Sequence, residues 1–133
     1  MNRVVVPVRY PLSAGSKRAL REACSVAAER DADIVVLHVD LYQNGRKVRR
    51  STLRAAVETE VGPLPGAEYV IRSGYLFSET IREEIDAQDA EVVVIGRGRD
   101  ALWRRVLSRA TGRRSLAATL SESVDCSIIE VSA

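Results

Sequence analysis

Arginines crowd one stretch of the 133-residue sequence, and guanidinium groups are well suited to holding phosphates and carboxylates. The stretch contains one acid, Asp100, beside Arg97, Arg99, Arg104, Arg105, Arg109, Arg113 and Arg114. Each guanidinium group offers a planar fork of donors that holds an anion through two hydrogen bonds. The stretch therefore predicts an anion site. The alternative is that these charges are solvated and only keep a long loop soluble.

The other reactive side chains form no catalytic pattern. His38 is the only histidine and stands in an apolar run between Leu37 and Val39, so we expect a structural role for it. Cys24 and Cys126 are far apart and lack Cys-x-x-Cys spacing, which predicts reduced core thiols. No nucleophile and base stand at a suggestive spacing. We expect no catalytic residue, no metal site and no enzyme activity.

The composition is that of an ordinary globular protein. Hydrophobic residues make up 46% of the sequence and charged residues 29%, and the net charge of +2 is too small to imply nucleic-acid binding. No apolar run approaches the roughly 20 residues that span a bilayer, and the first residues read as a strand rather than a signal peptide. We expect a single domain over residues 1–133 that stays in the cytoplasm and does not enter membranes.

Strand-like and helix-like patterns alternate along the chain. Apolar runs at 4–8, 34–39, 68–71, 91–96 and 127–131 predict strands, and amphipathic patterns at 16–30, 51–61 and 77–85 and around 116–124 predict helices. This order predicts an α/β fold, a doubly wound parallel sheet with helices on both faces. The Asn44-Gly45 pair predicts a loop, with a small hairpin as the alternative.

The alternation also predicts where a ligand would bind. In an open parallel sheet the crevice lies beyond the carboxyl ends of the strands, where the winding direction reverses. If the runs at 4–8 and 91–96 are neighbours, Arg9, Arg97 and Arg99 meet at this crevice. The start of the last helix, near Arg114 and Ser115, closes it. Each cation in the first turn of that helix is unfavourable to the helix dipole and lowers stability by about 0.3–1 kcal/mol, unless an anion lies between the cations.

Several segments, taken in order and spacing, resemble the universal stress protein family along nearly the whole chain. They are residues 4–8, residues 16–20, Leu37-His38-Val39 and residues 89–96. The resemblance implies a five-stranded parallel sheet of order 3-2-1-4-5 and frequent homodimers. It also implies, in many members, ATP or AMP bound at the crevice predicted above.

The sequence departs from the pattern of the family's ATP binders. Those members carry Asp directly after the first strand, and then Gly-x-x-Gly, nine residues and Gly-Ser/Thr for the phosphates. Here Arg9 replaces the Asp, Arg99 the second glycine and Arg114 the third, before a retained Ser115 and with a longer intervening loop. Arginine cannot accept the hydrogen bonds of a ribose. Side chains at the glycine positions also hinder close approach of a phosphate to the backbone.

We therefore do not expect ATP in the family's usual pose. An anion, a phosphate-bearing small molecule or a nucleotide turned around is expected instead, or Arg9 fills the site itself. Gly96 and Gly98 lack the third glycine and acidic partner of a dinucleotide fingerprint. The candidate ligand-binding residues are Pro7, Arg9, Val39, Ile95, Gly96, Arg97, Arg99, Arg114, Ser115 and Leu116.

Three function classes follow, in this order. The first is a universal stress protein-type regulatory module that forms a homodimer through the fifth strand, because an apolar edge strand at 127–131 invites pairing with its own copy. The second is a nucleic-acid or polyanion binder using the stretch from Arg97 to Arg114. The third is a nucleotide-using enzyme of related fold.

Overall fold

Five parallel strands form one sheet in the order β3-β2-β1-β4-β5, which confirms the predicted order. The computed structural model describes residues 2–45, 47–97, 120–121 and 124–132. The described elements are β1 (Arg3–Pro7), α1 (Ala14–Arg30), β2 (Asp33–Leu41), the 3-10 turn η1 (Tyr42–Asn44), α2 (Arg50–Val61), β3 (Glu68–Gly74), α3 (Phe77–Gln88), β4 (Val92–Arg97) and β5 (Ser127–Ser132). The arginine-rich stretch after Arg97 lies outside the described residues, as does most of the predicted last helix.

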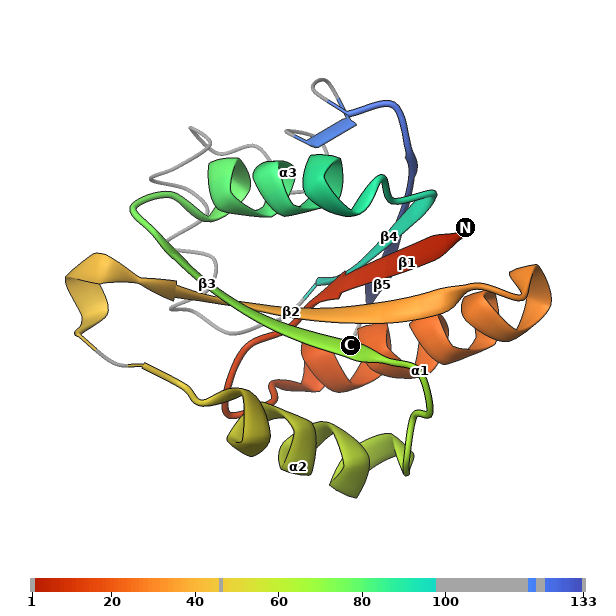
Figure 1. The fold of residues 1–133 in the computed structure, drawn as a ribbon, viewed down its shortest axis with the longest axis horizontal. Helices are drawn as coiled ribbons and strands as arrows, with labels where there is room; N and C mark the ends of the chain where they lie inside the picture. The colour runs from red at the N-terminus through yellow and green to blue at the C-terminus, as the bar shows by residue number, and fades with distance from the viewer. Residues whose placement is uncertain (1, 46, 98–119, 122–123, 133) are drawn as a thin grey trace.

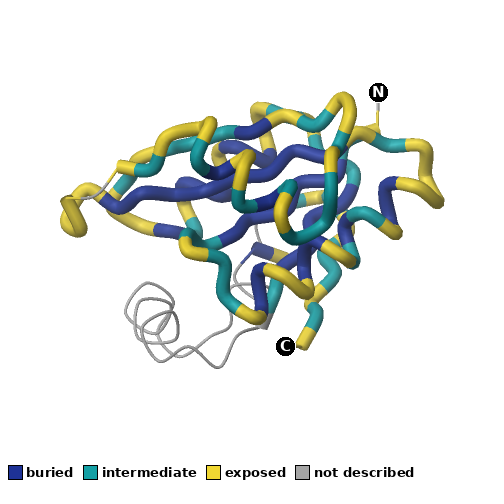
Figure 2. The backbone as a smooth tube through the Cα atoms, turned by 90° about the horizontal axis from the view of Figure 1, so that it is seen from below, coloured by how far each residue is buried: buried dark blue, intermediate teal, exposed yellow. Residues whose placement is uncertain are grey.

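Helices cover both faces of the sheet. Helices α1 and α2 lie on one face and α3 on the other (Figure 1). The side chains of β1 alternate between two cores, since Val4 and Val6 pack towards α1 and α2 whereas Val5 packs towards α3. Figure 2 shows the central strands as the most buried part of the chain. Their continuous valine and isoleucine runs are therefore explained by burial on both sides.

The structure sets several element boundaries differently from the sequence patterns. Helix α1 begins at Ala14, two residues before the predicted start, because the Ser13 hydroxyl caps it. Strand β3 continues to Gly74 rather than ending at residue 71, because it pairs with β2 as far as Leu41. The Asn44-Gly45 pair ends η1, with Gly45 at φ 66°, so the predicted loop is confirmed and the hairpin is not formed.

A chain of polar contacts fastens α3 across the sheet. Glu84 is buried, with 4% of its surface exposed, and one carboxylate oxygen lies 2.7 Å from Nε of Arg72 on β3. Its other oxygen accepts a 2.6 Å hydrogen bond from Gln88, which in turn accepts one from Arg3 on β1.

Within the described ranges, no helix is both long and apolar enough to cross a membrane.

Candidate functional site

The carboxyl ends of β1, β2 and β4 meet at one edge of the sheet. Pro7 of β1 pairs with Leu37 of β2, and Val5 pairs with Val93 of β4. Beyond Pro7 the backbone N–H of Val8 donates to the carbonyl oxygen of Leu37 at 2.8 Å, and Arg9 is the next residue along the chain. Arg9, just beyond β1, and Val39 and Arg97, near the carboxyl ends of β2 and β4, are thus at the end of the sheet where parallel sheets bind ligands.

Two serines tie the segment after β1 to the start of α1. The backbone N–H of Arg9 donates to the Ser16 hydroxyl at 2.8 Å, and the Ser13 hydroxyl donates to the same oxygen at 3.0 Å. The Ser13 oxygen also accepts the Ser16 backbone N–H at 3.1 Å. These bonds satisfy donors at the helix start without an acid, since the first turn of α1 contains none. They hold Arg9 in place by its backbone.

Gly96 lies where β4 passes the start of α1. A Cβ atom at position 96 would collide with the backbone carbonyl group of Gly15. The glycine is therefore required for close packing of strand and helix, whether or not a phosphate ever approaches it. This explains its presence without a ligand.

His38 and Asp40 form a buried polar pair that the sequence analysis missed. Both project from β2 on the side of α1 and α2, and they are 7% and 8% exposed. The imidazole Nδ1 lies 3.0 Å from the carbonyl oxygen of Val8, and Nε2 lies 2.8 Å from Oδ1 of Asp40. Oδ2 of Asp40 accepts the backbone N–H of Val48 at 2.8 Å. The spacing of two along a strand, which puts both side chains on one face, was the available signal.

Comparison with solved structures identifies this arrangement over the whole length of the chain. A universal stress protein family protein from Arabidopsis thaliana with AMP bound has 19% sequence identity and a TM-score of 0.63, with 99% of this chain and 91% of that chain covered. The universal stress protein from Archaeoglobus fulgidus in complex with dAMP has 20% identity and a TM-score of 0.59, with 98% and 97% covered. The chain has the universal stress protein fold.

A third solved structure with this fold, a universal stress protein in complex with cAMP, has 16% identity and a TM-score of 0.63, with 98% of this chain and 96% of that chain covered. No protein-family model and no curated protein matches the sequence. At these identities the structures share the universal stress protein fold, and the roles of individual residues have to be argued from this chain.

The described part of the universal stress protein fold contains six of the predicted site residues, all near the carboxyl ends of β1, β2 and β4: Pro7, Arg9, Val39, Ile95, Gly96 and Arg97. Pro7, Val39 and Ile95 are buried, so at this edge they offer backbone groups rather than side chains. Arg9 is partly buried. The remaining predicted residues, Arg99, Arg114, Ser115 and Leu116, lie outside the described residues, and their ligand role stays a prediction.

Two hollows lie elsewhere on the described surface. A shallow groove of about 670 Å³ runs between the segment after β1 and α2, and its walls include Lys17 and Glu60, so it offers no uniform charge for an anion. A second hollow, of about 510 Å³, lies beside Glu91 and Ser127 at the amino ends of β4 and β5. The candidate crevice lies at the other end of the strands, beyond their carboxyl ends.

Both cysteines are free thiols, and both are only partly buried. The prediction of free thiols is confirmed, and each thiol packs against a core cluster without being fully buried. Desolvation raises the pKa of Cys24 and of Cys126. A thiol with a raised pKa is a poorer nucleophile at neutral pH. The described residues also contain no group of three metal-ligating side chains.

Proposed function

We propose that this protein is a regulatory module of the universal stress protein type that acts in the cytoplasm without catalytic side chains of its own. The proposal is supported by one observation above all. The universal stress protein fold extends over the whole chain, and an arginine, Arg9, follows β1 at the carboxyl end of the sheet. A positively charged crevice favours an anionic ligand.

The ligand we propose is a phosphate-bearing small molecule, with nucleotides bound weakly or not at all. Structures with this fold hold AMP, dAMP and cAMP, which supports a nucleotide-related crevice. Arg9 has no acceptor for ribose hydroxyl groups, whereas its guanidinium group can donate two hydrogen bonds to a phosphate. The chain would thus keep the phosphate preference of the crevice and lose its preference for the nucleoside.

Titration calorimetry with ATP, AMP and inorganic phosphate tests this proposal. We expect nucleotides to bind with a dissociation constant weaker than about 1 μM, which corresponds to about 8 kcal/mol. The Arg9→Asp variant should bind AMP more tightly and phosphate more weakly than the natural chain, because it supplies the acceptor and removes the cation. Arg18→Ala, on the exposed side of α1, is the control. Binding of ATP near 1 μM by the natural chain would refute the proposal.

We further propose that the protein works as a homodimer joined through β5. This strand is at the end of the sheet, and two of its apolar side chains, Ile129 and Val131, are only partly buried. Pairing of an edge strand with its own copy across a two-fold axis satisfies its free backbone groups and covers such side chains.

A further inference from the structure

The buried imidazole of His38 lies between two hydrogen-bond acceptors. The carbonyl oxygen of Val8, 3.0 Å from Nδ1, can only accept a hydrogen bond, so Nδ1 carries a proton. A neutral imidazole with this proton has a lone pair on Nε2. Oδ1 of Asp40 lies 2.8 Å from that nitrogen, and an ionised carboxylate is also an acceptor only. Without a further proton, two lone pairs would face each other in a buried place, which is unfavourable.

The bond on the far side of Asp40 favours placing this further proton on the histidine. Asp40 already accepts the backbone N–H of Val48 on its other oxygen, and such a bond stabilises the ionised carboxylate. Along the adjoining segments the charged residues next in sequence to Val8 and Val48 are Arg9, Lys47 and Arg49. On β3 the residues in register with His38 and Asp40 are Ile71 and Ser73, which are uncharged. None of these positions holds a second acid that would compete with Asp40 for the ionised state.

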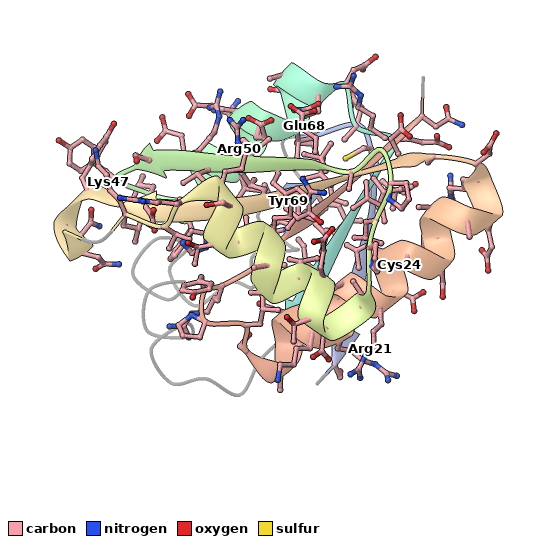
Figure 3. The ribbon with its side chains drawn as sticks, turned by 60° about the horizontal axis from the view of Figure 1, so that its bottom comes forward. Arg21, Cys24, Lys47, Arg50, Glu68 and Tyr69 are labelled. Atoms are coloured by element: carbon pink, nitrogen blue, oxygen red, sulfur yellow. The ribbon has the colours of Figure 1, made fainter. Side chains whose placement is uncertain are left out.

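We propose that the folded domain holds His38 as a doubly protonated imidazolium paired with Asp40, and that this pair is a clamp on the three chain segments around the crevice. The clamp joins the end of β2, the segment after β1 through Val8, and the segment before α2 through Val48. Figure 3 shows Lys47 in that last segment and Arg50 at the start of α2. His38 and Asp40 are positioning residues in this scheme.

The clamp borders two of the predicted ligand positions. Arg9 follows Val8 directly, and Val39 lies between His38 and Asp40 on the same strand. Movement of either adjoining segment would therefore change the crevice edge. That the clamp tunes ligand affinity rests on the proposed function, whereas the protonation of the pair does not.

The histidine can be observed directly, because the sequence contains only one. We would record the long-range ¹H–¹⁵N spectrum of the untagged, ¹⁵N-labelled protein at pH 7.5. The expected spectrum has both ring nitrogens protonated. In Asp40→Asn, the amide can donate to Nε2 and still accept from Val48, so the fold is kept and only Nδ1 should be protonated. Asp33→Asn, an exposed change on the same strand, is the charge-matched control and should retain both protons.

Urea unfolding at pH 7.5 gives the second readout. Asp40→Asn keeps the hydrogen bonds but removes the charge pair, so it should unfold at a lower urea concentration than the natural chain, whereas Asp33→Asn should not. An unprotonated Nε2 in the natural chain at pH 7.5 would overturn the proposal. The natural chain could instead show both ring protons but bind neither phosphate nor AMP. That result would support the clamp and contradict the proposed function.

Discussion

Substitution by alanine would have different consequences at two glycines of the sheet, because the added Cβ would contact different groups. At Gly96 a Cβ would collide with the backbone carbonyl group of Gly15, and at Gly74 it would collide with the hydroxyl of Thr80. A carbonyl in the first turn of a packed helix cannot turn aside. The Thr80 side chain can change its rotamer, at the loss of its 2.8 Å hydrogen bond to the Leu76 carbonyl oxygen.

Gly96→Ala should therefore lower the free energy of unfolding by about 1–3 kcal/mol, as overpacking of a core does, and Gly74→Ala should lower it by less. Urea denaturation measures both changes. Thr80→Ala provides the matched test, because it removes the obstacle at position 74. The double variant Gly74→Ala/Thr80→Ala should be more stable than the sum of the two single changes predicts. Strict additivity would show that the collision is relieved in another way.

At the scale of elements, the start of α1 depends on one side chain. Ser13→Ala removes the hydroxyl that accepts the Ser16 backbone N–H and should lower the free energy of unfolding by about 1 kcal/mol. Thermal denaturation followed by circular dichroism measures this loss. Ser25→Ala, at an exposed position of the same helix, is the control and should change stability by less than about 0.5 kcal/mol. Equal losses would mean that Ser13 does not act as a cap.

The sequence patterns predicted element types and their order better than element ends. The valine runs of β1 and β4 show burial on both faces, which is a local property of the sequence. The end of β3 is different, because its last residues are strand-like only through pairing with β2, which the local pattern does not contain. The early start of α1 could have been found from Ser13, since serine is a preferred cap.

The candidate site was predictable as far as topology determines it. The strand order makes the carboxyl ends of β1, β2 and β4 neighbours, so Arg9, Val39 and Arg97 are at the same end of the sheet. The bonds of His38 were not predictable in the same way, because its partners include the backbone groups of Val8 and, through Asp40, Val48. Backbone groups carry no residue-specific signal, so such contacts become visible only in three dimensions.

At the scale of the whole molecule, the sheet has two unlike edges. Strand β3, at one edge, carries Arg72, which is bound by the carboxylates of α3. Strand β5, at the other, has three partly buried apolar residues, Ile128, Ile129 and Val131, and its exposed residues are Ser127, Glu130 and Ser132. Charged residues discourage edge pairing and apolar ones permit it. The difference favours β5 as the place where a second copy would attach.

We expect the chain to be a dimer by light scattering at micromolar concentration, and Ile129→Pro to shift it towards monomer, because proline removes a backbone donor from the strand. Ile71→Pro, on the opposite edge strand, is the matched control and should leave the dimer intact. Circular dichroism establishes that each variant is folded.

Hydrogen exchange gives a readout that needs no substitution, since β5 amides paired on both sides should exchange more slowly at concentrations where the dimer forms. A monomeric natural chain, or a dimer that survives Ile129→Pro in folded protein, would exclude this interface.

The contact between Gly96 and Gly15 has a consequence for how such proteins change over evolution. Because the carbonyl of Gly15 occupies the space of a side chain at position 96, selection for folding alone removes variants that replace this glycine. A lineage that gives up a nucleotide can thus lose other glycines of its phosphate loop and still keep this one. A motif search that takes the glycine at position 96 as evidence of nucleotide binding would then predict an activity from a residue that packing alone requires.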